Sequence, residues 1–151
     1  MIGLLQRVLR AEVEVEEEVV GHIDSGILLL VGIEQKDGYP EADRLIDRAL
    51  NYRIFADQQG RMNDSLTDTG GGLLLVPQFT LVADTRKGNR PSFSKAADPD
   101  KSEVWFDYLA ERARALHPEV ATGRFGADMR VSLVNDGPVT FYLRVTPGSQ
   151  S

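Results

Sequence analysis

A chain of 151 residues with a net charge of −6 and 26% charged residues has the size and composition of one soluble globular domain. It has no cysteine, which excludes a disulfide framework, a cysteine nucleophile and a zinc–thiolate site. The acidic balance argues against bulk attraction to nucleic acid but allows a local basic patch. Because no apolar run approaches the ~18 residues of a membrane span and no signal peptide is recognisable, we expect a cytoplasmic protein without membrane contact.

The first third of the chain predicts strands followed by a helix. Residues 11–15 alternate apolar and acidic side chains, which predicts a strand with one solvated face, and residues 16–21 turn it into a hairpin. The continuous apolar run 27–33 predicts a strand buried on both faces. Pro40 suits the first turn of a helix, and the apolar residues between 42 and 49 have helical spacing.

The remaining elements are less regular. Residues 70–72 are three glycines that predict a flexible lead-in, and residues 73–82 predict an apolar strand interrupted by polar residues. A second helix begins near Asp98-Pro99 and ends at His117-Pro118. Residues 129–145 form two apolar runs around an Asn-Asp-Gly-Pro turn, which predicts a hairpin.

The inventory of reactive side chains is thin. His22 and His117 are the only histidines, and their positions do not match the spacing of metal ligands. The chain has no Gly-x-Ser-x-Gly motif of a serine hydrolase. We therefore expect no metal, no cofactor and no catalytic triad.

Gln78-Phe79-Thr80 places polar residues in an otherwise apolar segment, where they need partners or a cavity. One interpretation makes Thr80 a hydroxyl nucleophile, although no base is identifiable nearby in sequence. A second interpretation uses the backbone amides of Phe79 and Thr80, with the Gln78 side chain, as donors to a developing oxyanion. A third is a core-facing threonine without function.

A glycine- and proline-containing loop carries most of a local basic patch. Its cations are Arg86, Lys87, Arg90 and Lys95, and only Asp84 opposes them. Such a loop is either a solvated surface or a contact for nucleic-acid phosphates.

Gly137-Pro138 is the most informative dipeptide of the chain. An X-Pro bond adopts the cis form at modest cost, and glycine brings no side chain, so the pair can present two backbone carbonyls to a ligand. The plainer interpretation is an ordinary hairpin turn.

Three segments in this order resemble the D-aminoacyl-tRNA deacylases of the bacterial and eukaryotic type. They are Gln6-Arg7-Val8, then Gln78-Phe79-Thr80-Leu81 with the basic loop after it, and then Asn135-Asp136-Gly137-Pro138-Val139-Thr140. The resemblance extends from residue 1 to about 145. It implies an α+β fold with a compact, β-barrel-like mixed sheet and two main helices. We expect one deacylase domain over residues 1–146 and a disordered tail over residues 147–151.

The resemblance also implies a function. Members of this family are homodimers with the active site at the subunit interface. They hydrolyse the ester between a D-amino acid and the terminal adenosine of tRNA, and also clear glycine from mischarged tRNA. Gly137-Pro138 would be cis and would exclude L-amino acids in the partner's site, and Arg7 would hold it in place.

The chemistry implied by the resemblance uses the substrate's own 2′-hydroxyl, with Gln78, Phe79 and Thr80 forming the catalytic element. Thr80 would position the substrate and not attack it, and oxyanion stabilisation would come from backbone donors. The basic loop with Arg86, Lys87 and Arg90 would lie near the 3′ end of aminoacyl-tRNA, and we expect no DNA partner.

One residue departs from the family pattern. Pro77 stands where the family usually has serine, and it lacks both a backbone donor and a hydroxyl. This departure puts in question how strictly L-substrates are rejected, and it leaves the expected reaction class unchanged. Two rival readings are a non-catalytic dimeric module that binds tRNA ends, and a hydrolase of small esters or amides with Thr80 as nucleophile.

Overall fold

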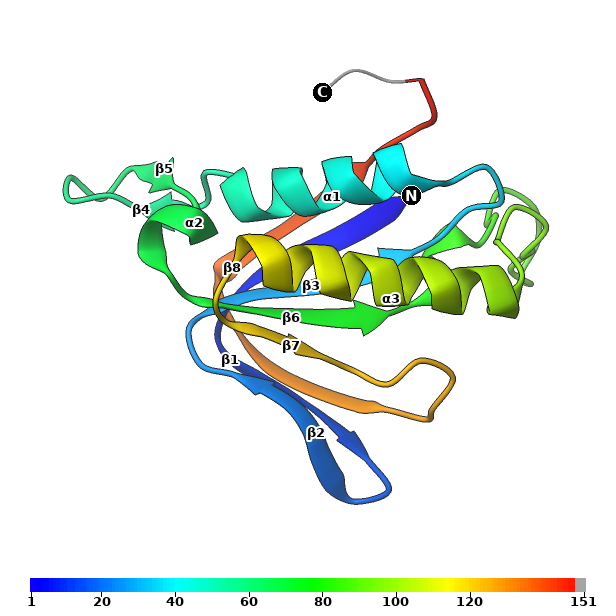
Figure 1. Cartoon of the computed structure of the whole chain (residues 1–151), viewed down its shortest axis with the longest axis horizontal. Coiled ribbons are helices and arrows are strands. Elements are labelled where there is room, and N and C mark those ends of the chain that lie inside the picture. Colours follow the sequence, from blue (N-terminus) through cyan, green and yellow to red (C-terminus); the bar gives the residue numbers. More distant parts are fainter. Residues whose placement is uncertain (149–151) are drawn as a thin grey trace.

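Two long helices cover one face of a six-stranded mixed sheet in the computed structural model, which describes residues 1–148 (Figure 1). The strands of this sheet are β1 (Ile2–Val15), β2 (Glu18–Ile23), β3 (Gly26–Gly32), β6 (Gly72–Pro77), β7 (Val120–Thr122) and β8 (Arg130–Arg144). The helices are α1 (Tyr39–Asn51), the short α2 (Leu66–Thr69), α3 (Pro99–Leu116) and the 3₁₀ turn η1 (Phe79–Val82). A small separate hairpin consists of β4 (Phe55–Ala56) and β5 (Met62–Asp64).

The long strand β1 organises the sheet. It pairs antiparallel with β2, β3 and β8, whereas β6 pairs in parallel with β3 and β7. The sheet curls until β2 approaches β7, where a Cβ atom on Gly21 would lie 2.5 Å from the carbonyl oxygen of Thr122. Glycine therefore permits this closure, and the predicted α+β fold with a barrel-like mixed sheet is confirmed.

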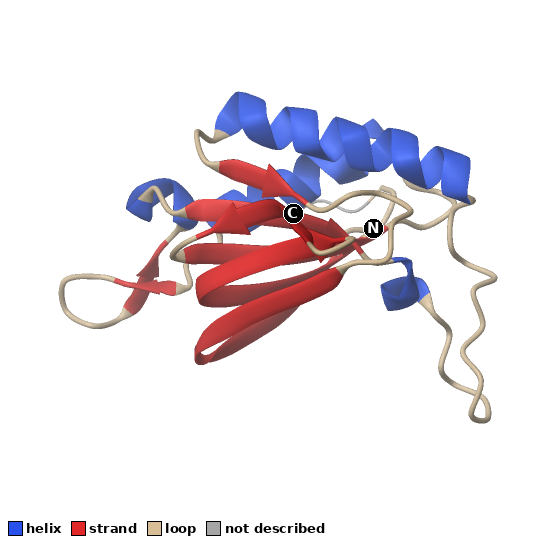
Figure 2. Ribbon diagram, turned by 90° about the horizontal axis from the view of Figure 1, so that it is seen from below, coloured by secondary structure: helices blue, strands red, loops and turns tan. Residues whose placement is uncertain are grey.

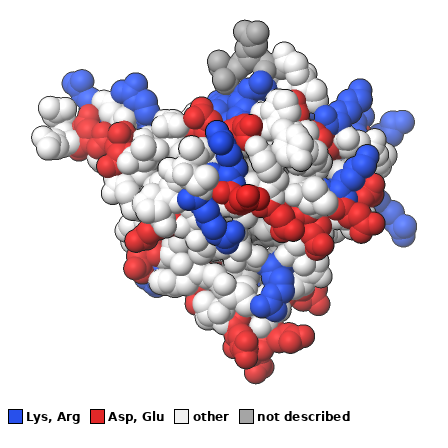
Figure 3. Space-filling view, in the orientation of Figure 1, with Lys and Arg blue, Asp and Glu red and all other residues white. Residues whose placement is uncertain are grey.

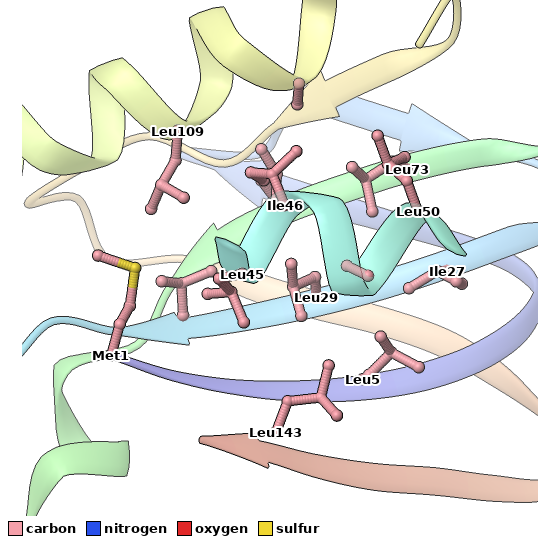
Figure 4. Close-up of a cluster of buried hydrophobic side chains, with 14 of the residues drawn as sticks. Met1, Leu5, Ile27, Leu29, Leu45, Ile46, Leu50, Leu73, Leu109 and Leu143 are labelled. Carbon is pink, nitrogen blue, oxygen red and sulfur yellow. The ribbon is translucent and has the colours of Figure 1, made fainter. Parts of the chain in front are cut away.

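The core has two parts that lie on opposite faces of the sheet. The larger cluster fills the space under the helices, where Leu45 and Ile46 of α1 and Leu109 of α3 lie over Leu29 and Leu73 (Figure 4). Figure 2 shows both long helices on the same side of the sheet. The smaller cluster fills the barrel and is formed by Val8, Ala11, Val13, Val15, Ile23, Leu28, Leu74 and Val76.

Local sequence signals account for both long helices. Gly38 precedes α1, and its N–H donates to the Glu41 carboxylate at 2.8 Å. Asp98 caps α3 by accepting from the N–H of Lys101 at 3.0 Å, and the helix ends at His117. These are the start and stop signals expected of helices, so both predicted helices are confirmed.

The predicted hairpin at residues 16–21 is also confirmed. Glu16 and Glu17 have φ angles of 51° and 67°, and they join β1 to β2. Two successive residues with positive φ match the twist of a two-residue hairpin. The strand before them is longer than predicted, since β1 begins at Ile2.

Three predicted elements are wrong. Residues 73–82 are not one strand: β6 ends at Pro77, which has no N–H for the ladder, and η1 follows. Residues 129–145 are not a hairpin, because β1 is long enough for both halves of the single strand β8 to pair with it. The glycines at 70–72 are not a loose lead-in, because Gly72 begins β6 and a Cβ atom there would lie 2.7 Å from Ile23.

The hairpin β4–β5, helix α2 and strand β7 were not predicted. Pro147 and Gly148 form a turn, and residues 149–151 of the predicted disordered tail lie outside the described residues. Among the helices of residues 1–148, none combines the length and hydrophobicity needed to cross a membrane.

Candidate active site

Gly137-Pro138 lies in an outward loop of β8. The pairing of β8 with β1 joins Asn135 to Val8 and Thr140 to Gln6, so residues 136–139 stand opposite Arg7 alone. The Gly137-Pro138 peptide bond is cis, and both residues are exposed. The loop therefore presents main chain to the solvent from the middle of a strand.

The side chain of Asn135 closes the base of this loop. Its Oδ1 accepts from the N–H of Val139 at 3.1 Å, while its Nδ2 donates to the carbonyl of Val139 at 2.9 Å. The same Nδ2 also donates to the carbonyl of Arg7 at 3.0 Å. One amide side chain thus ties the two ends of the loop to each other and to β1.

Arg7 holds the loop from the other side. Its Nε donates to the carbonyl of Asp136 at 3.1 Å and lies 3.3 Å from the Asp136 carboxylate. Its Nη1 donates to the carbonyl of Ile54 at 2.6 Å. Since the Arg7 side chain is only 15% exposed, these bonds are shielded from solvent. The contacts are those expected of a residue that supports Gly137-Pro138.

Gln78, Phe79 and Thr80 form a second exposed element at the end of β6. The Gln78 side chain donates a hydrogen bond to the Thr80 hydroxyl, and the Gln78 N–H donates to the carbonyl of Val31 at 2.7 Å. Thr80 is exposed, so the interpretation as a core-facing threonine is wrong. In the described part of the chain, the backbone N–H groups of Phe79 and Thr80 have no acceptor. The first amides of a helical turn are free to bind a ligand oxygen in this way.

A cavity of about 500 Å³ adjoins this element. Pro77, Gln78 and Phe79 line one side of it, and Phe125 and Met129 line another. Phe79 is 63% exposed and packs against Phe93 with 5.2 Å between ring centroids and 51° between ring planes. The cavity therefore offers apolar and aromatic walls next to the Gln78–Thr80 element, which suits a flat heterocycle attached to a polar group.

The cavity contains little acid–base chemistry. Asp128 is the only titratable residue among the described residues that line it. Residues 1–148 contain no cluster of His, Asp and Glu that could hold a metal ion. The candidate site thus provides hydrogen-bond donors and a shaped cavity for a ligand, and little that could act as a protein base or nucleophile.

The basic loop contains one neutralised cation. Arg86 forms a two-pronged ion pair with Asp84, at 2.6 and 2.9 Å, and this hydrogen bonding holds the pKa of the Asp84 carboxyl well below its usual range. Within residues 1–148, Lys87 and Arg90 have no ion-pair partner. Figure 3 shows Lys and Arg side chains projecting at the right-hand edge of the molecule, where Figure 1 places the loop between η1 and α3.

The two exposed elements do not meet within one chain. Pro77 lies level with Gly3, whereas the loop stands opposite Arg7, and β8 is three strands away from β6. At a rise of about 3.3 Å per residue and a spacing of about 4.8 Å per strand, they lie roughly 20 Å apart. Figure 1 shows the end of β6 and the bend of β8 at opposite ends of the sheet.

Comparison with known proteins decides the family. The family model described as D-Tyr-tRNA(Tyr) deacylase matches residues 4–144. The chain belongs to the D-Tyr-tRNA(Tyr) deacylase family. As a member of this family it is a hydrolase.

Relatives of the deacylase family cover nearly the whole chain. A protein of Stutzerimonas stutzeri (strain A1501) named D-aminoacyl-tRNA deacylase is 64% identical over 143 residues, which are 95% of this chain and 99% of the relative. A protein of Paracidovorax citrulli (strain AAC00-1) with the same name is 61% identical over 147 residues, or 97% and 95% of the two chains.

Two solved structures share the deacylase fold. One is titled c-Myc DNA Unwinding Element Binding Protein, with a TM-score of 0.93, 36% identity and coverage of 97% of this chain and 99% of the other. The other is titled as a structural analysis of a probable eukaryotic D-amino acid tRNA deacylase, with a TM-score of 0.81, 15% identity and coverage of 94% and 97%. At 15% identity the second structure supports the fold alone.

Two parts of the candidate site are not evident from the sequence. Asn135 lies in a predicted turn, although its side chain is the clamp of the loop. Ile54 gave no signal at all, because its contribution is a backbone carbonyl that the fold brings to Arg7. Such contacts cannot be found without knowing that β1 and β8 pair.

Proposed function

We propose that the protein hydrolyses the ester between a D-amino acid, or glycine, and the terminal adenosine of tRNA in the cytoplasm, and that Gly137-Pro138 rejects L-amino acids. The family match supports the substrate class. One observation carries the finer proposal: an exposed main-chain loop, clamped by Asn135 and Arg7, projects from the strand. A rigid main-chain surface can exclude a side chain of the wrong hand without contacting the reacting atoms.

The site is proposed to need two subunits. The loop and the Gln78–Thr80 element are too far apart within one chain to contact one substrate. A second copy brings the loop of one subunit to the cavity of the other. The sheet face opposite the helices supports this arrangement, because Tyr142, Leu4 and Leu30 stand side by side there and Tyr142 is 55% exposed.

The chemistry is proposed to be substrate-assisted. The free N–H groups of Phe79 and Thr80 stabilise the oxyanion of the tetrahedral intermediate, which commonly accounts for a factor of ~10²–10³ in rate per donor. Gln78 fixes the Thr80 hydroxyl, so that Thr80 positions the ester. The ribose 2′-hydroxyl of the substrate assists the attack of water. It thereby takes the role that a protein base has in other hydrolases.

The adenine of the terminal nucleotide is proposed to occupy the cavity beside Phe79, with the tRNA backbone along Lys87 and Arg90. Aromatic walls suit a stacked base, and unpaired cations suit phosphates. Arg86 contributes less than its neighbours, because Asp84 already neutralises it.

The mechanism is tested with D-tyrosyl-tRNA that ends in 2′-deoxyadenosine. We expect this substrate to be bound but hydrolysed far more slowly than its ribose counterpart. Thr80→Ala should lower the rate without abolishing it, and no acyl-enzyme should accumulate in the wild type. Hydrolysis of the deoxy substrate at the normal rate, or a trapped acyl-Thr80, would instead support a threonine nucleophile.

The dimer is tested with a charge on the proposed interface. Tyr142→Arg should give a monomer in sedimentation equilibrium and lose the discrimination against L-tyrosyl-tRNA, because the loop no longer reaches the cavity of a partner. Val104→Arg is the matched control, since Val104 is 60% exposed on α3 and lies on the helical side of the sheet. A monomeric Tyr142→Arg variant with full activity and selectivity would overturn the shared site.

A further inference from the structure

Residues 52–54, the segment between α1 and β4, support the Gly137-Pro138 loop at both of its ends. At the first end the support is indirect, because the carbonyl of Ile54 accepts the 2.6 Å hydrogen bond of Arg7 on β1, and the Nε of Arg7 donates to the carbonyl of Asp136. After the loop, the Tyr52 ring packs edge-on against Phe141, with 5.5 Å between centroids and 75° between planes. We call residues 52–54 the brace.

The brace is itself fixed by its surroundings. The Ile54 side chain is only 2% exposed and belongs to the main core. Tyr52 follows directly on α1, and the guanidinium of Arg48 lies 5.8 Å from its ring centroid. Arg53 donates to the backbone and side-chain oxygens of Asn63, both at 2.9 Å, which ties the hairpin β4–β5 to the brace. Because the brace is fixed by these contacts, it can restrict the movement of the Gly137-Pro138 loop.

We propose that the brace sets the position of Gly137-Pro138, and that Tyr52 is thereby a positioning residue for the discrimination between D- and L-substrates. This inference rests on the proposed function of the loop. Tyr52 acts through Phe141, three residues beyond Pro138, and Ile54 acts through Arg7. Tyr52 does not line the cavity, so its effect reaches the substrate only through the loop.

Discrimination is sensitive to this support for a geometric reason. Steric exclusion of an L side chain depends on the place of the loop carbonyls, and a loop that shifts admits what it formerly excluded. The side chain of a D-substrate does not point toward the loop carbonyls in the proposed site. Turnover of the D-substrate therefore does not depend on the brace. The brace therefore affects the D-to-L ratio of kcat/KM more than it affects kcat/KM for the D-substrate.

The test compares three variants of the full-length protein. Tyr52→Leu removes the edge-on ring contact, while Tyr52→Phe keeps the ring and loses only the hydroxyl. Tyr39→Leu is the matched control, because Tyr39 begins the same helix and packs edge-on against Trp105 and Tyr108, away from the loop. The readouts are kcat/KM for D-tyrosyl-tRNA and for L-tyrosyl-tRNA, and the hydrogen exchange rate of the Val139 amide.

For Tyr52→Leu we expect a fall of about two- to tenfold in the D-to-L ratio of kcat/KM, the rate equivalent of one edge-on ring contact. We also expect faster exchange of the Val139 amide and nearly unchanged kcat/KM for the D-substrate. Tyr52→Phe should restore the wild-type ratio, and Tyr39→Leu should not alter it.

Two outcomes would overturn the inference: an unchanged ratio and exchange rate in Tyr52→Leu, or an equal fall in Tyr39→Leu. If the wild type hydrolyses neither ester, the proposed function fails separately. The exchange rate of the Val139 amide then decides whether the brace supports the loop.

Discussion

Gly137 is a position where one added methyl group should disturb the exposed loop directly. Its φ angle is +148°, a conformation that L side chains rarely adopt. A Cβ atom there would lie 2.6 Å from the Cγ2 atom and 2.7 Å from the backbone nitrogen of Val139. That nitrogen donates to Asn135, so Gly137→Ala would strain the backbone and push against the clamp of the loop.

The expected cost follows from these two effects. A residue held in a sparsely populated backbone conformation costs on the order of 1–3 kcal/mol, and a weakened hydrogen bond adds about 1 kcal/mol. We expect Gly137→Ala to lower the free energy of unfolding by about 2–4 kcal/mol unless the loop moves away. If the loop moves, less stability is lost but the carbonyls that are proposed to exclude L side chains are displaced.

The assay combines urea denaturation with the deacylation rates of D- and L-tyrosyl-tRNA. The control is Gly60→Ala, because Gly60 has a φ angle of +78° and a Cβ atom there would have no neighbour within 4 Å. We expect Gly60→Ala to cost about 1–2 kcal/mol and to leave the D-to-L ratio unchanged. A Gly137→Ala protein with wild-type stability and wild-type selectivity would refute the reasoning about the loop.

Three further predictions concern the supports of the fold. Asn135→Ala should cost about 1–3 kcal/mol in urea denaturation and lower the D-to-L ratio, since buried partners lose their hydrogen bonds; an unaltered ratio would contradict the clamp. Asp37→Asn should lower stability by about 3 kcal/mol, because it removes the negative charge that lies 2.8 Å from the buried Met1 ammonium, and a change below 0.5 kcal/mol would count against that ion pair. The hydrogen bond to Asp43 raises the pKa of the Tyr108 hydroxyl, so its contribution is present below pH 10 and is lost as the pH rises through the raised pKa. The stability difference between wild type and Tyr108→Phe should therefore vanish at high pH, and a difference that persists there would contradict this assignment.

The parts of the fold that depend on local signals could be predicted from the sequence. Pro40 and Asp98 mark the starts of the two long helices, and the structure has both. The alternation in residues 11–15 gave the strand and its buried face. These signals lie within a few residues of the element they specify, so no knowledge of the tertiary structure is needed.

The errors arose where pairing between distant segments decides the structure. The Asn-Asp-Gly-Pro sequence is a good hairpin turn, yet β8 continues through it because β1 offers a partner on both sides. The end of β6 at Pro77 was missed because the apolar pattern continues into η1. Whether a strand continues thus depends on its neighbours as much as on its own residues.

The candidate site shows the same division. Gly137-Pro138 and Gln78-Phe79-Thr80 were identified from their residue types, and the structure places both at the surface. Their places at opposite ends of the chain's sheet, and the support of the loop by Asn135 and Ile54, followed only from strand register and side-chain geometry. Backbone groups that bind through their position have no signature in the sequence.

The proposed D-selective deacylation is tested most directly by the deacylation rates of D-tyrosyl-tRNA and L-tyrosyl-tRNA with the purified wild-type protein. We expect rapid loss of the D ester while the L ester decays at its spontaneous rate. Loss of both esters would contradict the chiral role of Gly137-Pro138 and direct attention to Pro77. Spontaneous decay of both would contradict catalysis itself and favour a module that only binds tRNA ends.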